Sequence, residues 1–344
     1  MARARVIVCN TMDPFVTGGS ELFATRLTEE LNRAGHEALL VTFPFRLRRF
    51  EVEGLVRATT PWRALDLTGS ADVVIPLRYP TWLTEHPHQL VYLNHQLRTA
   101  YELFDTPHGP RATERALAAR QYVVECDAEL GRAQKIFAVS RNVQHRLKHF
   151  NGLESEVLYH SLPLEGQHHP GSTGNFVLSV GRLVAMKRFD LLIRAVAAAK
   201  SAVRCLIVGE GRERSRLEQL IADLQIEDRV KLLGWVSTAE LIELYAGALG
   251  VFYAPVDEDY GLVTLEAFHS AKPVLTAMDS GGTLEFVQDG INGRVLPPDP
   301  VAFAEAIDQW YHDRSLATRL GLNGAGSVQH ISWERCVNTL AEHF

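Results

Sequence analysis

The sequence predicts an α/β protein made of two doubly wound domains, and three observations support this class. The chain has 344 residues, which is more than one hydrophobic core usually holds. Short apolar runs typical of buried strands alternate with longer amphipathic runs typical of helices, the order of a parallel sheet with crossover helices. This alternation lapses once, over 162–174, where two prolines and three glycines indicate a linker.

The first half of the chain opens with a β-α-β unit, in which a helix over Ser20–Ala34 separates two apolar strands. Strands are predicted at Arg5–Asn10, Glu37–Phe43, Asp72–Leu77, Gln89–Leu93, Lys135–Val139 and Glu156–Tyr159. Further helices are predicted over Ala112–Arg132 and from a cap at Ser140 to about Phe150. The segment Pro44–Ser70 has no clear pattern and yields no prediction.

The second half alternates more sharply. Strands are predicted at Phe176–Val180, Cys205–Val208, Val230–Leu232, Leu249–Tyr253 and Pro273–Ala277. Helices are predicted near Phe189–Lys200, Arg214–Leu224, Ser237–Ala246, Val263–Ser270, Thr283–Gln288, Pro300–His312 and Trp333–His343. The predicted organisation is an N-terminal domain over 1–163, a linker over 164–174, a C-terminal domain over 175–325 and a last helical segment over 326–344 that packs back toward the first domain.

Composition excludes several classes of protein. A net charge of -6 argues against a nucleic-acid partner. No apolar run reaches the roughly 18–20 residues of a membrane span, and we expect no secretory leader. Four scattered cysteines are typical of reduced, buried thiols, which predicts a cytoplasmic protein. Arg46, Arg48 and Arg49 form a basic cluster that is either a solvated face or a contact with an anionic acceptor or the inner face of a membrane.

The stretch from Asp257 to Glu266 carries the strongest chemical signal. It leads from a predicted buried strand into a predicted helix, and it places two carboxylates, Glu258 and Glu266, on either side of Gly261. Glycine allows close backbone approach, and the free N–H groups of a helix start attract anions. Carboxylates on both sides of an anion site suit a nucleotide sugar, which has hydroxyls on both sides of its diphosphate. The alternative is a surface loop with two acidic residues.

Candidate ligands also follow other predicted strands. Gly181 and Arg182 come directly after strand Phe176–Val180, with Lys187 five residues further, so two cations lie where open α/β sheets bind ligands. In the first half, Gly18 and Gly19 follow the first strand, and His95 follows strand Gln89–Leu93. Each has a structural alternative: surface charges, a tight turn, and a buried histidine.

Together these residues resemble family 4 glycosyltransferases of the GT-B fold, in which two Rossmann-like domains face each other across a cleft. The resemblance covers nearly all of the second domain and patches of the first. Its motifs are E-x7-E at Glu258 and Glu266, G-R…K at Gly181, Arg182 and Lys187, G-G-x-E at Gly18–Glu21, and landmarks at Val208–Gly211, Gly234–Val236, Gly281–Glu285 and Asp289–Gly293. Arg188, where glycine often follows the lysine, and Ser270-Ala271, where Cys-Gly or Ala-Gly is common, depart from the pattern.

The resemblance implies residue roles. His95, Glu258, Arg182 and Lys187 would be catalytic: His95 would contact the sugar or acceptor, Glu258 would hold sugar hydroxyls, and the two cations would stabilise the leaving diphosphate. The implied donor site is completed by Gly18, Gly19, Val236, Tyr260, Gly261, Leu262 and Glu266. In that site Glu266 would bind the ribose, and the backbone near Val236 would meet the base.

The implied reaction is transfer of a hexose-type sugar, with retention, from a UDP- or GDP-sugar to a hydroxyl of a glycan, a lipid-linked or a small-molecule acceptor. A GT-B nucleotide-sugar epimerase and a non-catalytic sugar-nucleotide-binding protein remain alternatives. We expect no cofactor and no metal, although Asp257-Glu258-Asp259 also spells the D-x-D pattern of metal-dependent transferases.

Overall fold

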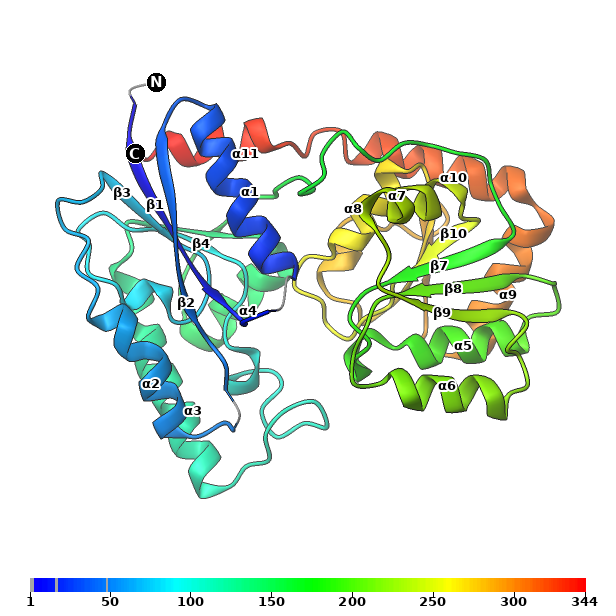
Figure 1. Cartoon of the computed structure of the whole chain (residues 1–344), viewed down its shortest axis with the longest axis horizontal. Coiled ribbons are helices and arrows are strands. Elements are labelled where there is room, and N and C mark those ends of the chain that lie inside the picture. The colour runs from blue at the N-terminus through cyan, green and yellow to red at the C-terminus, as the bar shows by residue number, and fades with distance from the viewer. Residues whose placement is uncertain (1–2, 16–17, 48) are drawn as a thin grey trace. The chain divides into compact units, whose positions relative to one another are not determined.

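The chain divides into two compact units. The computed structural model describes every residue except 1, 2, 16, 17 and 48, so Arg48 of the basic cluster lies outside the described residues. Unit 1 comprises Met1–Pro163 together with Ile331–Phe344, and unit 2 comprises Leu164–His330. Residues 164–174, predicted as a linker, are therefore part of unit 2, and the last segment of the chain is part of unit 1 (Figure 1).

Unit 1 contains a parallel sheet in two halves. The half with order β2-β1-β3 is built from β1 (Arg5–Met12), β2 (Glu37–Pro44) and β3 (Val73–Pro76); the half with order β4-β5-β6 is built from β4 (Leu90–Leu93), β5 (Lys135–Ala138) and β6 (Glu156–Val157). An isolated parallel bridge between Val74 and Gln89 joins the halves. Because all these strands are parallel, the loops that follow them emerge at one edge.

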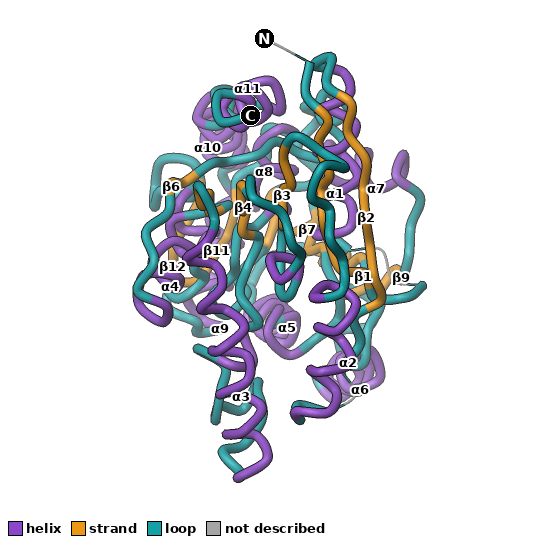
Figure 2. Tube along the Cα trace, turned by 90° about the vertical axis from the view of Figure 1, so that its left-hand side faces the viewer, coloured by secondary structure: helices purple, strands orange, loops and turns teal. Residues whose placement is uncertain are grey.

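Helices flank the strands of unit 1 (Figure 2, helices purple and strands orange). They are α1 (Gly19–Arg33), α2 (Val52–Arg63), α3 (Glu114–Asp127), α4 (Arg141–Asn151) and α11 (Trp333–Ala341), with 3₁₀ turns η1 (Thr81–Leu83), η2 (Arg98–Ala100) and η3 (Ala128–Arg132). Ser140 caps α4 as predicted, because its Oγ accepts the Val143 N–H at 3.0 Å. Helix α2 lies in the segment for which the sequence yielded no prediction.

Unit 2 contains one six-stranded parallel sheet of order β12-β11-β10-β7-β8-β9. Its strands are β7 (Phe176–Val180), β8 (Arg204–Val208), β9 (Val230–Gly234), β10 (Gly250–Phe252), β11 (Val274–Ala277) and β12 (Gly293–Leu296). The chain proceeds from β7 to β8 and β9 on one side, then returns to place β10, β11 and β12 on the other. The switch point of this sheet is therefore between β7 and β10, the place where doubly wound sheets bind ligands.

Helices cover both faces of this sheet (Figure 1). They are α5 (Phe189–Ala198), α6 (Arg214–Asp223), α7 (Thr238–Gly247), α8 (Leu262–His269), α9 (Pro300–His312) and α10 (Arg314–Ser327), with 3₁₀ turns η4 (Ala185–Lys187) and η5 (Gly282–Glu285). The helix predicted over Thr283–Gln288 is wrong, because only the 3₁₀ turn η5 forms there. Strands β7 and β10 have buried centres, as expected for parallel strands covered on both faces.

The cysteines and the membrane-span criterion were both subjects of expectations from the sequence. All four cysteines, Cys9, Cys126, Cys205 and Cys336, are buried and unpaired. Within the described ranges, no helix combines the length and the apolar character that crossing a bilayer requires.

Candidate active site

Eight of the predicted site residues lie in loops and turns at the carboxyl edge of the unit 2 sheet, or in the helix that begins there. Arg182 and Lys187 follow β7, and Val236 follows β9. Glu258, Tyr260, Gly261 and Leu262 follow β10, and Glu266 is on α8. The loops after β7 and β10 flank the switch point, so the fold brings the predicted cations and carboxylates to the same place.

Lys187, Glu258 and Tyr253 form a closed cluster. The Lys187 ammonium pairs with Glu258 Oε2 and donates to Tyr253 Oη at 2.8 Å, and Tyr253 Oη donates to the same Glu258 oxygen at 2.9 Å. The Glu258 side chain is 18% exposed. Burial opposes its ionisation, but the Lys187 charge and the two hydrogen bonds outweigh burial and hold the pKa of Glu258 below its ordinary value. Glu258 is therefore an ionised acceptor at neutral pH.

Glu266 has a different environment. It is half-buried on α8, and Tyr245 of α7, which is fully buried, donates its hydroxyl hydrogen to Glu266 Oε2 at 2.5 Å. Burial raises the pKa of Glu266 above its ordinary value, and the bond from Tyr245 offsets part of that effect. The pKa values of the two carboxylates of the E-x7-E motif are thus displaced in opposite directions. Each carboxylate accepts a hydrogen bond from a tyrosine, Glu258 from Tyr253 and Glu266 from Tyr245.

The backbone of the Glu258 loop is held by the loop that follows β11. Gly282 N donates to Glu258 O at 2.7 Å, and Glu258 N donates to Ser280 O at 3.3 Å. A Cβ on Gly282 would meet the Asp259 carbonyl oxygen at 2.4 Å, so glycine is required for this approach. Gly261 caps the start of α8 with φ of 93°, a conformation that favours glycine.

Arg182 is exposed, and among the described residues its guanidinium has no hydrogen-bond or ion-pair partner. The loop that carries it packs closely on the loop after β8. A Cβ on Gly209 would lie 1.9 Å from the Gly181 carbonyl oxygen, and Gly181 N donates to Val208 O at 3.0 Å. An unpaired arginine on a firmly packed loop at a sheet edge is available to bind an anion.

Both departures from the family pattern fall on left-handed backbone. Arg188 has φ of 52°, and Ala271 also has φ of 52°. Glycine occupies this region without the steric cost that a Cβ brings. Arg188 makes a bidentate ion pair with Asp279, at 2.6 Å for each N–O contact, which ties the Lys187 loop to the loop after β11.

The predicted residues of unit 1 lie at the corresponding edge of its own sheet. Gly18 is the N-cap of α1 and Gly19 its first residue, and Glu21 Oε2 accepts the Gly18 N–H at 3.0 Å. Arg78 pairs with Glu21 at 3.5 Å. His95 is half-buried after β4, with Nδ1 at 2.6 Å from the Gln96 carbonyl oxygen.

The Asp257-Glu258-Asp259 triplet retains its two interpretations. Throughout the residues that the structure describes, no group of three or more His, Cys, Asp or Glu side chains is arranged to hold a metal ion. Glu258 of the triplet is the ion-pair partner of Lys187.

Sequence reasoning missed the two tyrosines. Tyr253 ends an apolar run that was interpreted as core, and Tyr245 precedes Glu266 by 21 positions on another helix. The adjacency of Tyr253 to the acidic triplet was a usable signal, because a tyrosine at a strand end can direct its hydroxyl into the following loop. Tyr245 left no signal in the sequence.

Comparisons with known proteins agree on the family. Residues 164–326 match the family described as glycosyl transferases group 1. The lipopolysaccharide core biosynthesis glycosyltransferase LpsE of Rhizobium meliloti is 37% identical over 150 residues, 43% of each protein. The alpha-1,3/1,6-mannosyltransferase ALG2 of Mus musculus is 36% identical over 112 residues, 33% of this chain and 27% of that protein. The matched regions thus span less than half of either relative.

The fold comparison extends further along the chain. HepE of Anabaena, solved in complex with UDP and glucose, aligns over 99% of both chains with a TM-score of 0.76 at 17% sequence identity. This likeness shows the fold, and it confirms the predicted class of two Rossmann-like units. Residues 164–326 match the glycosyl transferases group 1 family, and the chain as a whole has the GT-B fold.

Proposed function

We propose that the protein is a glycosyltransferase that moves a hexose-type sugar from a nucleotide-diphosphate donor to a hydroxyl of a glycan, a glycolipid or a small molecule. The observation that carries the proposal is the arrangement at the switch point of unit 2. An ionised Glu258 paired with Lys187, an Arg182 with no partner among the described residues, and the start of α8 lie in the loops that flank it, with Glu266 one turn further on α8.

The leaving diphosphate is the group that these cations suit. Negative charge grows on it as the bond to the sugar breaks, and Arg182, Lys187 and the N–H groups at the start of α8 can stabilise that charge. In the free protein Lys187 is paired with Glu258. When a donor binds, Lys187 turns to the diphosphate while Tyr253 continues to donate to Glu258. Because these positive groups can stabilise the leaving diphosphate by themselves, we propose a reaction that does not depend on metal.

Glu258 and Glu266 are proposed to bind the two hydroxyl-bearing ends of the donor. Glu258, being ionised, would accept from sugar hydroxyls and favour positive charge on the ring in the transition state. Glu266 keeps an oxygen beyond its bond to Tyr245 and would accept from the ribose. HepE structures in complex with UDP and with UDP-glucose support a uridine nucleotide over guanosine.

Retention at the anomeric carbon is the proposed stereochemistry, with the leaving phosphate assisting deprotonation of the acceptor on the same face. For His95, Gly18 and Gly19 of unit 1, the roles stay those that the resemblance implies. We propose a cytoplasmic location, with contact at the inner membrane face through exposed Arg46 and Arg49 if the acceptor is lipid-linked. Cosedimentation with anionic vesicles tests that contact.

A thermal-shift screen with UDP, GDP, UDP-glucose and GDP-mannose tests the donor class. A ligand present at a hundredfold its dissociation constant adds about 2.7 kcal/mol to stability. NMR of the products from the stabilising donor and a panel of acceptors then reads the stereochemistry. Transfer that survives exhaustive EDTA treatment supports metal independence, and activity lost to EDTA and restored by Mn²⁺ contradicts it.

The same assays separate the alternatives. An epimerase changes the sugar of the donor without an acceptor, and a non-catalytic protein binds the donor without turnover. Arg182→Ala and Lys187→Ala should each reduce transfer by about 10²-fold or more, as expected for loss of a group that stabilises transition-state charge. Rates near wild type in either variant would contradict the role assigned to that cation.

A further inference from the structure

A second basic site lies in unit 1, at the end of β2. A pocket with a volume of about 370 Å³ is lined by Pro44, Arg46, Arg49, Glu51, Gly54, Arg57 and Ala58. Pro44 is the last residue of β2, and Gly54, Arg57 and Ala58 are on α2. Because Pro44 pairs with Met12 of β1, the pocket lies at the sheet edge where the Gly18 loop also begins.

The three arginines of the pocket are not used by the fold. Arg46, Arg49 and Arg57 are exposed, and in the described part of the chain none of them has a hydrogen-bond or ion-pair partner. With Glu51, the described residues of the lining carry three positive charges and one negative charge, which sum to +2. A concave site with this charge and unpaired guanidinium groups is complementary to an anion.

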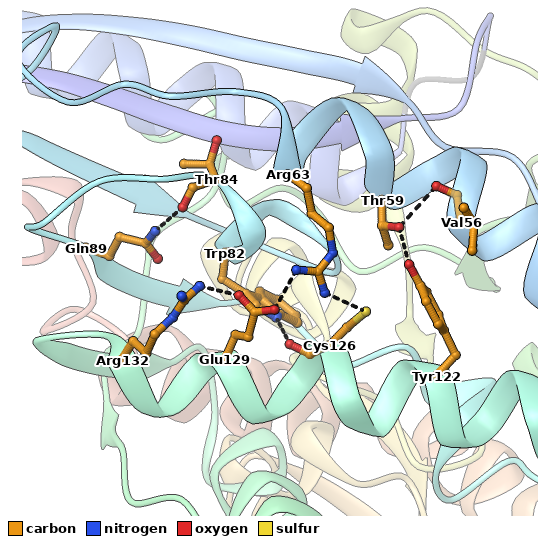
Figure 3. Close-up of polar contacts among 10 residues, drawn as sticks. All are labelled: Val56, Thr59, Arg63, Trp82, Thr84, Gln89, Tyr122, Cys126, Glu129 and Arg132. Carbon is orange, nitrogen blue, oxygen red and sulfur yellow. Dashed lines mark hydrogen bonds and ion pairs between the residues drawn. The ribbon is translucent and has the colours of Figure 1, made fainter.

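Arg63 is also on α2, but unlike the arginines of the pocket it makes contacts that hold the fold together. Its guanidinium pairs with Glu129 at 2.7 Å and contacts Cys126 Sγ at 3.5 Å, while Thr59 Oγ1 and Tyr122 Oη share a hydrogen bond of 2.6 Å (Figure 3). These contacts fix the C-terminal half of α2 to α3 and η3. The pocket-lining half of α2 therefore projects Arg57 from an anchored helix.

We propose that this pocket binds a phosphate group. A phosphate monoester carries a charge of about -1.5 to -2 at pH 7, which matches the lining better than the single charge of a carboxylate. Arginine also fits phosphate oxygens bidentately. The volume is at the small end of the range of about 300–1,000 Å³ for small-molecule sites, so it accommodates the phosphate with the part of the molecule that bears it. The proposed occupant is a phosphate-bearing acceptor.

The proposal that the pocket binds phosphate does not depend on the proposed transferase activity. The proposal that this phosphate belongs to the sugar acceptor does rest on that activity. Hydrogen–deuterium exchange on the full chain separates the two. Inorganic phosphate and glucose 6-phosphate should each protect the amides of residues 44–58. UDP, if the proposed function holds, should protect residues 181–188 and 257–266 of unit 2.

The variant carrying Arg46→Gln and Arg57→Gln should lose the protection at 44–58, and each single substitution should raise the dissociation constant for phosphate about tenfold. Arg115→Gln is the matched control: it removes an exposed arginine of α3 that has no partner among the described residues, and it should bind phosphate as the wild type does. Added NaCl should weaken the binding.

Two further probes distinguish the sources of the phosphate. Protection of 44–58 by vesicles that contain phosphatidic acid but not by glucose 6-phosphate assigns the phosphate to a lipid headgroup, and the reverse result assigns it to a soluble acceptor; both support a phosphate site. The proposal is overturned if no phosphate compound protects 44–58, if acetate protects it equally at the same concentration, or if the double variant retains full protection.

Discussion

Replacing Tyr253 by phenylalanine tests how the donor site is organised. Tyr253 is buried, with 6% of its surface exposed. Its hydroxyl donates to Glu258 at 2.9 Å and accepts from Lys187 at 2.8 Å. A hydrogen bond to a charged group contributes about 1.5–3 kcal/mol. When the donor is bound, Lys187 is proposed to turn to the diphosphate, and the bond to Glu258 is the one that Tyr253 keeps, so we count one such bond as lost. At 1.36 kcal/mol per factor of ten, kcat should fall about 10- to 150-fold.

The pH profile separates positioning from a general loss of structure. The bond from Tyr253 helps to lower the pKa of Glu258 against the effect of burial. Without that bond the pKa of Glu258 should rise, and the acid limb of the kcat profile should move to higher pH. Tyr311→Phe, the same substitution on α9, should change neither kcat nor the profile. A folded Tyr253→Phe enzyme with wild-type kcat and an unmoved acid limb would refute the reasoning.

Three further predictions concern the same unit. Glu266→Gln should weaken nucleotide binding in calorimetry yet raise the thermal midpoint at neutral pH. Burial raises the folded-state pKa of Glu266 above 4.5, so the stability that the protonated group contributes is lost as pH rises through that pKa. The neutral glutamine does not ionise and avoids this loss. An equal or lower midpoint at pH 7 would contradict this. Gly282→Ala should cut transfer strongly, because its Cβ would displace the Asp259 carbonyl, 2.4 Å away; unchanged kcat would count against the loop's role. Ala271→Gly should raise stability to urea by up to about 1 kcal/mol by relieving a φ of 52°, and a lower midpoint would disprove that.

Much of the fold could be predicted because most strands of unit 2 are continuous apolar runs. The bounds of β7 match the prediction, and those of β8 and β11 differ from it by one residue. Strand β12 was missed because Gly293–Leu296 is short and contains an arginine, so it has no apolar run. Helix α10 was missed because three glycines interrupt its pattern, although Gly321 and Gly324 are buried against neighbouring elements. Both elements form because of tertiary packing, which the local pattern of apolar and polar residues does not report.

The candidate site was predictable where chemistry depends on spacing along the chain. Glu258 and Glu266 lie on one loop and the helix that follows it, so their relation was fixed by local structure. The contacts that hold them depend on tertiary structure: Tyr245 reaches Glu266 from α7, and Lys187 reaches Glu258 from the loop after another strand. Such pairings follow from strand order, which the sequence pattern does not specify.

The discontinuity of unit 1 has a consequence for how the protein is made. Trp333 of α11 is 1% exposed; its indole N–H donates to Leu162 O at 2.8 Å, and its ring packs against His160 and Phe23 at centroid distances of 5.4 and 5.9 Å. During translation the whole of unit 2 is synthesised before this tryptophan, and it emerges from the ribosome before residues 331–344 do. Unit 2 can therefore fold as a continuous segment, while the apolar surface of unit 1 around Phe23 stays uncovered until residues 331–344 arrive. A nascent chain stalled before Trp333 is the form in which chaperones would find that surface exposed.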